Sequence, residues 1–298
     1  MTGPARSATY AAIAMLAAVA FFALMDAGLK QLSAHYPPFQ VAFLRSVASL
    51  PLVVPWAIAT APRGSLRRPR WSLQLLRTGI GMVMMASFIY AVSKLPLSTT
   101  YAIFFVAPLL ITALSVPLLR ERVGPRRWIA IGVGMLGVLV VLRPTGEGLA
   151  LLPALATLLA ALCYALSAIT VRFLARTDNT QSMMVWLLVL MTVGNGAIAA
   201  FDWQPLRMDD IWLIAGVGLV GALGQYAITE AFRTGEASAL APLEYTALLW
   251  GVLLDLSLWG VLPDAVTWLG AAIIVGSGLY LVRRERLHVA PAPGCEHP

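Results

Sequence analysis

The chain has 298 residues, of which 59% are hydrophobic and only 12% are charged. A soluble domain carries roughly twice that share of charged residues, and no soluble core of this length could hold so much apolar surface. The formal net charge is +7, but the positions of the basic residues relate it to membrane topology rather than to nucleic acid.

Long apolar stretches separated by short joints rich in Arg, Pro and Gly recur along the chain, which is typical of transmembrane helices. Ten helices are predicted, at 10–32, 38–60, 72–93, 97–119, 126–142, 150–174, 181–201, 210–232, 237–259 and 265–283. A β-barrel is excluded, because it would show short strands of alternating polarity. The first stretch is too long for a signal-peptide core and contains Asp26 and Lys30, so it is predicted to be a retained helix. The sequence therefore indicates an all-α polytopic membrane protein.

The basic residues are unevenly distributed between the two sets of connections. One side holds Arg6, Arg63, Arg67, Arg68, Arg70, Arg120, Arg122, Arg126, Arg127, Arg172, Arg176, Arg233, Arg283, Arg284 and Arg286, and the other holds Lys30, Lys94, Arg143 and Arg207. Because basic residues favour the cytoplasmic side, both termini are expected in the cytoplasm of a bacterial inner membrane.

Internal repetition divides the chain into two halves. The stretch 119–144 resembles 259–284, with Trp128 matching Trp268, and 20–32 resembles 162–174. We expect a first five-helix repeat at 1–145, a second at 146–284 and a cytoplasmic tail at 285–298. Because five is an odd number, the second repeat is expected to be inverted, which is the architecture of alternating-access transporters.

Three stretches carry a resemblance to a known family: "LPLSTTYAIFFVAPLLITALSVPLLRERVGPRRW", "ASALAPLEYTALLWGVLLDLSLWGVLPDAVTWLGAAIIVGSGLYLVRRE" and "VAFLRS". They resemble the EamA-type ten-helix transporters of the drug/metabolite transporter superfamily, most closely the amino-acid exporters such as the aromatic amino acid exporters of the YddG type. The resemblance implies export of amino acids or related small metabolites. The chain departs from the family pattern at Val261, where an acid is common, and at Asp255, where a small residue is usual.

Several patterns point away from enzyme chemistry. The glycine patterns at 132–137 and 216–221 lie inside apolar spans, where glycine lets helices approach closely, and lack the strand of a dinucleotide-binding loop. His35, His288 and His297 lie outside the spans, so no metal site is expected in the core, and no cofactor is expected. Cys163 and Cys295 give no disulfide framework.

Charged residues inside the spans are the first candidates for a site, because each costs roughly 2.5–3.5 kcal/mol at a helix centre. Asp26 and Arg45 lie at similar depth and are expected to form a structural ion pair, although Asp26 could instead face a substrate. Glu244 and Asp255 are eleven residues apart, which returns an α-helix to about the same face. We expect that face to line an aqueous pathway, with Glu244 binding substrate or closing a gate, while Asp255 could simply reach water at the membrane surface.

Polar aromatic residues and one amide complete the predicted substrate site. With Asp26 and Glu244, the expected substrate-binding residues are Tyr90, Tyr101, Tyr164, Gln225, Tyr226 and Trp250. Aromatic rings can hold an apolar side chain while their polar tips satisfy amine or carboxylate groups, although packing alone also explains any single ring. Pro108 and Pro242 are candidate hinges, with static kinks as the alternative.

The sequence thus predicts a secondary transporter that exports small molecules, not an enzyme. The expected partners are the substrate and the lipid bilayer, with no nucleic acid. The oligomeric state is left open, and a monomer would suffice. An intramembrane enzyme acting on lipid and a channel are the alternatives, but the channel would need a continuous polar filter.

The predicted topology can be tested with single cysteines in intact cells. Cysteines in the 61–70 connection should be protected from an impermeant thiol reagent, because that connection is predicted to face the cytoplasm. Cysteines in the 202–209 connection should be labelled. Labelling of the 61–70 positions would contradict both the orientation and the inverted arrangement.

Overall fold

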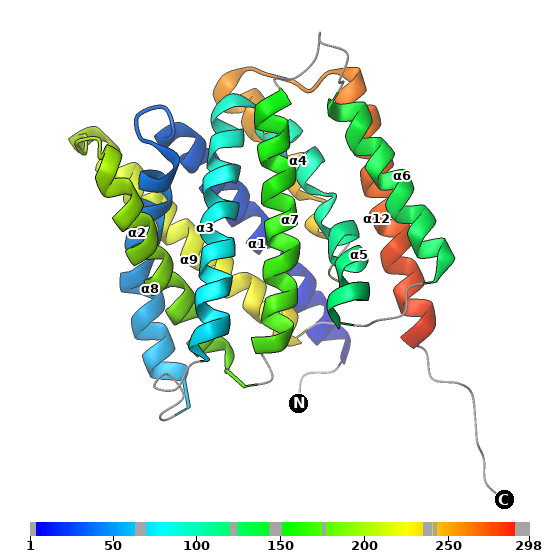
Figure 1. The fold of residues 1–298 in the computed structure, drawn as a ribbon, viewed down its shortest axis with the longest axis horizontal. Helices are drawn as coiled ribbons and strands as arrows, with labels where there is room; N and C mark the ends of the chain where they lie inside the picture. Colours follow the sequence, from blue (N-terminus) through cyan, green and yellow to red (C-terminus); the bar gives the residue numbers. More distant parts are fainter. Residues whose placement is uncertain are drawn as a thin grey trace, which may run out of the picture.

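The computed structural model describes residues 4–62, 70–119, 124–142, 151–174, 177–234, 240 and 243–289. These form a bundle of helices that run side by side, and the start of α1 and the end of α12 lie on the same side of it (Figure 1). The helices are α1 (Pro4–Leu32), α2 (Pro38–Thr60), α3 (Trp71–Lys94), α4 (Leu97–Phe104), α5 (Ala107–Leu119), α6 (Pro125–Leu142), α7 (Leu151–Leu174), α8 (Thr180–Ala199), α9 (Ile211–Thr234), α11 (Ala247–Leu254) and α12 (Ala265–Val289). The 3-10 helices η2 (Ala200–Asp202) and η3 (Met208–Asp210) connect α8 to α9, and η4 (Asp255–Trp259) is a π-helix that continues α11.

The described helices match the predicted spans closely. Seven are long and apolar enough to cross a membrane, and shorter apolar helices occupy the three remaining spans, at Trp128–Leu142, Ala247–Trp259 and Ala265–Tyr280. The all-helical membrane class is therefore confirmed, while the full count of ten crossings stays a prediction.

Two predicted spans are interrupted where the sequence suggested continuous helices. The span 97–119 is broken at Phe105 and Val106, and the span 237–259 is broken at Tyr245 and Thr246. The two breaks are 140 residues apart, and the same spacing separates the matching residues Trp128 and Trp268. The ring centroids of Phe105 and Tyr245 lie 5.0 Å apart in an edge-to-face contact, so the two breaks touch each other.

The break at Tyr245 removes the basis of one prediction about Glu244 and Asp255. The expectation of a single acidic face assumed 100° per residue along an uninterrupted α-helix. The helix is interrupted at Tyr245 and Thr246, between these two residues. Their side chains therefore have to be located separately.

Helix packing repeats between the halves. Helix α1 packs against α9 and α7 packs against α3, while α2 lies against α8, α4 against α11 and α6 against α12. Glycine allows the closest contacts: a Cβ at Gly270 of α12 would lie 2.9 Å from the carbonyl oxygen of Gly137, and one at Gly218 of α9 would clash with Ala48. Since Gly137 and Gly218 belong to the two glycine patterns, the packing interpretation of those patterns is confirmed.

The connections at the two ends of the bundle are tied together by hydrogen bonds. At one end, the Tyr36 hydroxyl donates to Asp210 at 2.9 Å, and Gln40 donates to the Gln204 carbonyl oxygen at 2.7 Å. At the opposite end, Asp178 accepts from Gln74 at 3.1 Å. The connections 33–37 and 203–210 therefore lie on the same side, as predicted, and the side of the membrane that they face stays a prediction.

Candidate functional site

The charged groups within the bundle lie at different depths along the crossing of α4 and α11. Lys30 and Asp255 lie toward the end that carries the 33–37 connection, Asp26 lies about one turn deeper, and Glu244 comes just before the break at Tyr245. Since each of these groups costs free energy in hydrocarbon, its partner indicates what it does.

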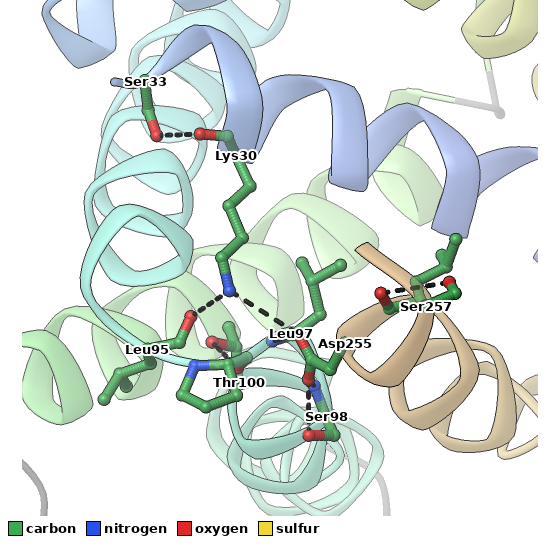
Figure 2. A network of polar contacts seen from close by, with 10 residues as sticks. Lys30, Ser33, Leu95, Leu97, Ser98, Thr100, Asp255 and Ser257 are labelled. Atoms are coloured by element: carbon green, nitrogen blue, oxygen red, sulfur yellow. Dashed lines mark hydrogen bonds and ion pairs between the residues drawn. The ribbon is translucent and has the colours of Figure 1, made fainter. Parts of the chain in front are cut away.

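Asp255 is completely buried and accepts three hydrogen bonds from the start of α4. Its carboxylate accepts from the backbone N–H of Leu97 at 2.9 Å, from that of Ser98 at 2.8 Å and from the Ser98 hydroxyl at 2.6 Å (Figure 2). The first backbone N–H groups of a helix lack partners within the helix, and a negative charge at this end is favoured. Asp255 thus caps α4 from a distant part of the chain, in place of a local capping residue.

Lys30 of α1 completes this cluster, which we call the Asp255 cluster (Lys30, Leu95, Leu97, Ser98 and Asp255). Its ammonium nitrogen lies 3.5 Å from Asp255 and donates to the carbonyl oxygen of Leu95, the C-cap of α3, at 2.9 Å (Figure 2). One ion pair therefore joins α1, the end of α3, the start of α4 and η4. The suggestion that Asp255 simply reaches surface water is wrong, because its side chain is completely buried.

Asp26 accepts a hydrogen bond from the buried hydroxyl of Tyr101, with 2.8 Å between the oxygen atoms. The predicted ion pair with Arg45 does not form: neither residue belongs to the two ion pairs found within 4.0 Å among the described residues. Arg45 instead donates to the sulfur atoms of Met25, at 3.1 Å, and Met85, at 3.9 Å. The tyrosine hydroxyl thus provides the partner that the sequence assigned to arginine.

A row of three aromatic rings joins α3, α4 and α7. Phe88 of α3 contacts Phe104 at 5.7 Å between centroids, and Phe104 contacts Tyr164 of α7 at 5.5 Å. The half-buried Glu244 interacts electrostatically with the hydroxyl groups of Tyr164 and Tyr245. This arrangement offers stacking surfaces together with one carboxylate.

The other predicted site residues are distributed more widely. Trp250 packs in a core cluster with Ala23 and Val92, and Tyr90 is half-buried on α3. Gln225 and Tyr226 line an apolar groove of about 180 Å³ formed by α2, α8 and α9, and Tyr226 is 50% exposed. The structure therefore does not bring these two residues to the aromatic row.

The crossing of α4 and α11 and the two candidate hinges can also be located. A Cβ at Gly251 of α11 would lie 2.8 Å from Tyr101 and 3.2 Å from Ser98, so the two helices pack closely there. Pro108 follows the break at Phe105, which fits a hinge, whereas Pro242 lies outside the described residues.

Two features of the site were missed by sequence reasoning. The sequence did not predict Ser98 and Lys30 as partners of Asp255. It did not predict Phe88 and Phe104 as site residues either, because only polar aromatic residues were candidates for substrate binding. The only sequence signal for the first was the spacing of "KLPLSTT", where a helix begins after Pro96 without an acidic residue to cap it. Within the described residues, no group of three or more His, Cys, Asp or Glu side chains could hold a metal ion.

Comparison with known proteins identifies a family. A sequence model of the EamA-like transporter family matches the chain twice, over residues 9–143 and 151–283. The riboflavin transporter of Vibrio cholerae is 30% identical over 278 residues, covering 92% of this chain and 93% of that protein. The S-adenosylmethionine uptake transporter of Rickettsia bellii is 26% identical and covers 88% of this chain and 89% of that protein.

A third relative and one solved structure agree with these matches. The riboflavin transporter of Brucella anthropi is 27% identical, over 84% of this chain and 89% of that protein. A solved structure, titled only as the crystal structure of a protein, overlays with a TM-score of 0.64 at 18% identity, covering 93% of this chain and 99% of that chain. This likeness shows the fold alone.

The Asp255 cluster predicts an energetic coupling between Lys30 and Asp255. Asp255→Asn or Lys30→Met should each lower the free energy of unfolding in detergent by about 2–4 kcal/mol, because each leaves a buried partner without its opposite charge. The double variant should lose less than the sum of the two. Additive losses would show that the two charges do not interact. Asp209→Asn, which changes an exposed carboxylate in η3, is the matched control.

Proposed function

Because the chain belongs to the EamA-like transporter family, we propose that this membrane transporter takes up riboflavin or a solute with a similar flat, nitrogen-containing ring. Membership in a transporter family also distinguishes between the three kinds of membrane protein considered from the sequence. The chain is a transporter rather than the lipid-modifying enzyme or channel considered from the sequence.

The aromatic row is the observation that carries the choice of substrate. Phe88, Phe104 and Tyr164 bring three rings together where α3, α4 and α7 meet, and a flat ring could stack against them. Relatives named for riboflavin and for S-adenosylmethionine support this choice, since both of those solutes contain a flat ring with several nitrogen atoms. The direction of transport is proposed to be uptake, because the relatives named for S-adenosylmethionine are called uptake transporters.

Export of amino acids, which the sequence resemblance implied, is the second candidate. The half-buried carboxylate of Glu244 could pair with a substrate ammonium, which is the observation in its favour. The named relatives do not support it, because none of those compared here is named for amino acids.

We further propose transport by alternating access between two inverted five-helix repeats, with both termini in the cytoplasm. The double family match, the paired packing of α1 on α9 and of α7 on α3, and the two equivalent breaks support this mechanism. The Asp255 cluster holds α1, α4 and η4 together, so it would close the periplasmic side in this state. Opening that side requires Lys30 and Asp255 to separate, with the breaks at Phe105 and Tyr245 as the points of bending.

Riboflavin uptake should be measurable in a bacterial riboflavin auxotroph that has no uptake system of its own. Expression of this chain should restore growth on micromolar riboflavin, and unlabelled riboflavin should compete with the labelled form better than tryptophan does. Phe104→Leu should raise the KM by roughly two- to tenfold, because it removes one stacking surface. Phe201→Leu, which makes the same change at a side chain that is 93% exposed, is the matched control.

Two results would contradict the proposal. One is absence of riboflavin accumulation in cells that contain the folded protein in the membrane. The other is efflux of labelled amino acids from preloaded vesicles without riboflavin transport, which would favour the second candidate.

A further inference from the structure

A second groove, with a volume of about 400 Å³, lies between α6 and α12. These two helices pack side by side at one edge of the bundle (Figure 1). Of the side chains that line the groove, those of Ile129, Val133 and Tyr280 are exposed. Its volume lies within the range of roughly 300–1,000 Å³ that small-molecule sites occupy. The groove therefore faces the surroundings of the bundle, which in a membrane protein are the lipids.

The contacts between α6 and α12 show how far the groove extends along the bundle. A Cβ at Gly134 of α6 would lie 2.7 Å from the hydroxyl of Ser277, and one at Gly137 would lie 2.8 Å from Ile274. This antiparallel register places Ala272 about thirteen residues from the first groove residue of α6. At 1.5 Å per residue the groove is about 20 Å long. Half of the hydrocarbon core of a bilayer is about 15 Å thick, so the groove has the length of one lipid leaflet.

The polar groups of the groove lie toward one end. Arg126, its first residue on α6, is exposed and belongs to neither of the two ion pairs found among the described residues. Tyr280 of α12 lies somewhat deeper, and tyrosine is favoured at the boundary between membrane and water. The remaining hydroxyl, that of Ser277, donates to the carbonyl oxygen of Ile274 at 2.7 Å. The groove is therefore positively charged at one end and apolar beyond it, as a binding site for an anionic phospholipid would be.

The sequence adds positive charge at the same end of the two helices. Arg127, Arg283, Arg284 and Arg286 belong to these ends, against the single acid Glu285, and their side chains lie outside the described part of the chain. A second copy related by a two-fold axis would bring these arginines against their own counterparts, where like charges repel. An anionic headgroup is attracted by the same charges. The charge at this end thus favours a lipid over a second copy as the occupant.

We propose that the groove between α6 and α12 binds an anionic phospholipid of the surrounding membrane. The phosphate pairs with the Arg126 guanidinium, which presents N–H donors in a planar fork. The glycerol ester groups lie beside Tyr280, and one acyl chain lies over Gly276 toward Ala272. Gly276 leaves this path open, since a Cβ there would have no atom within 4 Å. The site shares no helix with the aromatic row and does not depend on the transported solute.

Native mass spectrometry in detergent tests the proposal, with phosphatidylglycerol and phosphatidylcholine offered together. Wild type should retain one phosphatidylglycerol in preference to phosphatidylcholine. Arg126→Gln should reduce this preference about fivefold, which is the contribution of one basic residue near an anionic lipid. Gly276→Leu should abolish retention of the lipid, because leucine fills the groove. Gly132→Leu makes the same change on α6 at another position with no atom within 4 Å, outside the groove, and should retain the lipid as wild type does.

Three results would overturn the assignment. Equal retention of the two phospholipids by wild type would show an apolar groove without selection for charge. Equal retention of phosphatidylglycerol by Gly276→Leu and Gly132→Leu would place the lipid elsewhere on the protein. A dimer that Gly276→Leu dissociates and phosphatidylglycerol does not would show that a second copy occupies the groove. Arg126→Gln changes an exposed side chain, so it keeps the test decisive if Gly276→Leu does not fold. Since no solute is transported in this experiment, its outcome is independent of the proposed uptake of riboflavin.

Discussion

A carboxylate that is buried in a membrane bundle needs partners, and the partners of Asp255 come from two other segments. Lys30 belongs to α1, and Leu97 and Ser98 begin α4, while the Lys30 ammonium also caps the carbonyl of Leu95 at the end of α3. Ion pairs in such surroundings persist only when further hydrogen bonds satisfy the remaining lone pairs and protons. Here the two unsatisfied helix ends of α3 and α4 provide those bonds.

The same interaction explains the geometry deeper in the bundle. With its first turn held against η4, α4 crosses α11 where Gly251 leaves room for Tyr101 and Ser98. Tyr101 can then donate to Asp26, and the break at Phe105 meets its counterpart at Tyr245. Short helices joined at breaks bend more readily than continuous ones, and the proposed mechanism needs such bending at this crossing.

Much of the fold follows from the sequence because apolar surface costs free energy in water and charge costs free energy in hydrocarbon. Both effects act on every residue. They define most of the helices to within a few residues, and the glycine patterns predict close helix packing, as found where Gly137 meets Gly270. The candidate site follows less well. Asp26 and Arg45 share a depth, yet only the rotation of their helices decides that Asp26 faces Tyr101. Gln225 and Tyr226 lie apart from the aromatic row for the same reason, because depth alone does not show which face of α9 meets the groove beside α2.

Asp255 shows most clearly what pattern alone leaves open. The break at Tyr245 interrupts the helix between Glu244 and Asp255, and it is not apparent from apolar periodicity. The partners of Asp255 are more than 150 residues away in the chain. A single sequence holds no signal for such a pairing beyond the absence of a local cap at the start of α4.

Hydrogen exchange of the Leu97 and Ser98 amides tests most directly whether Asp255 holds the start of α4. In the protein reconstituted in lipid nanodiscs, both amides should exchange slowly, because a buried carboxylate accepts their N–H groups. Asp255→Ala should accelerate exchange at these two amides by at least about tenfold while the amides of α6 remain unchanged. Equal exchange at Leu97 and Ser98 in wild type and variant would contradict the account.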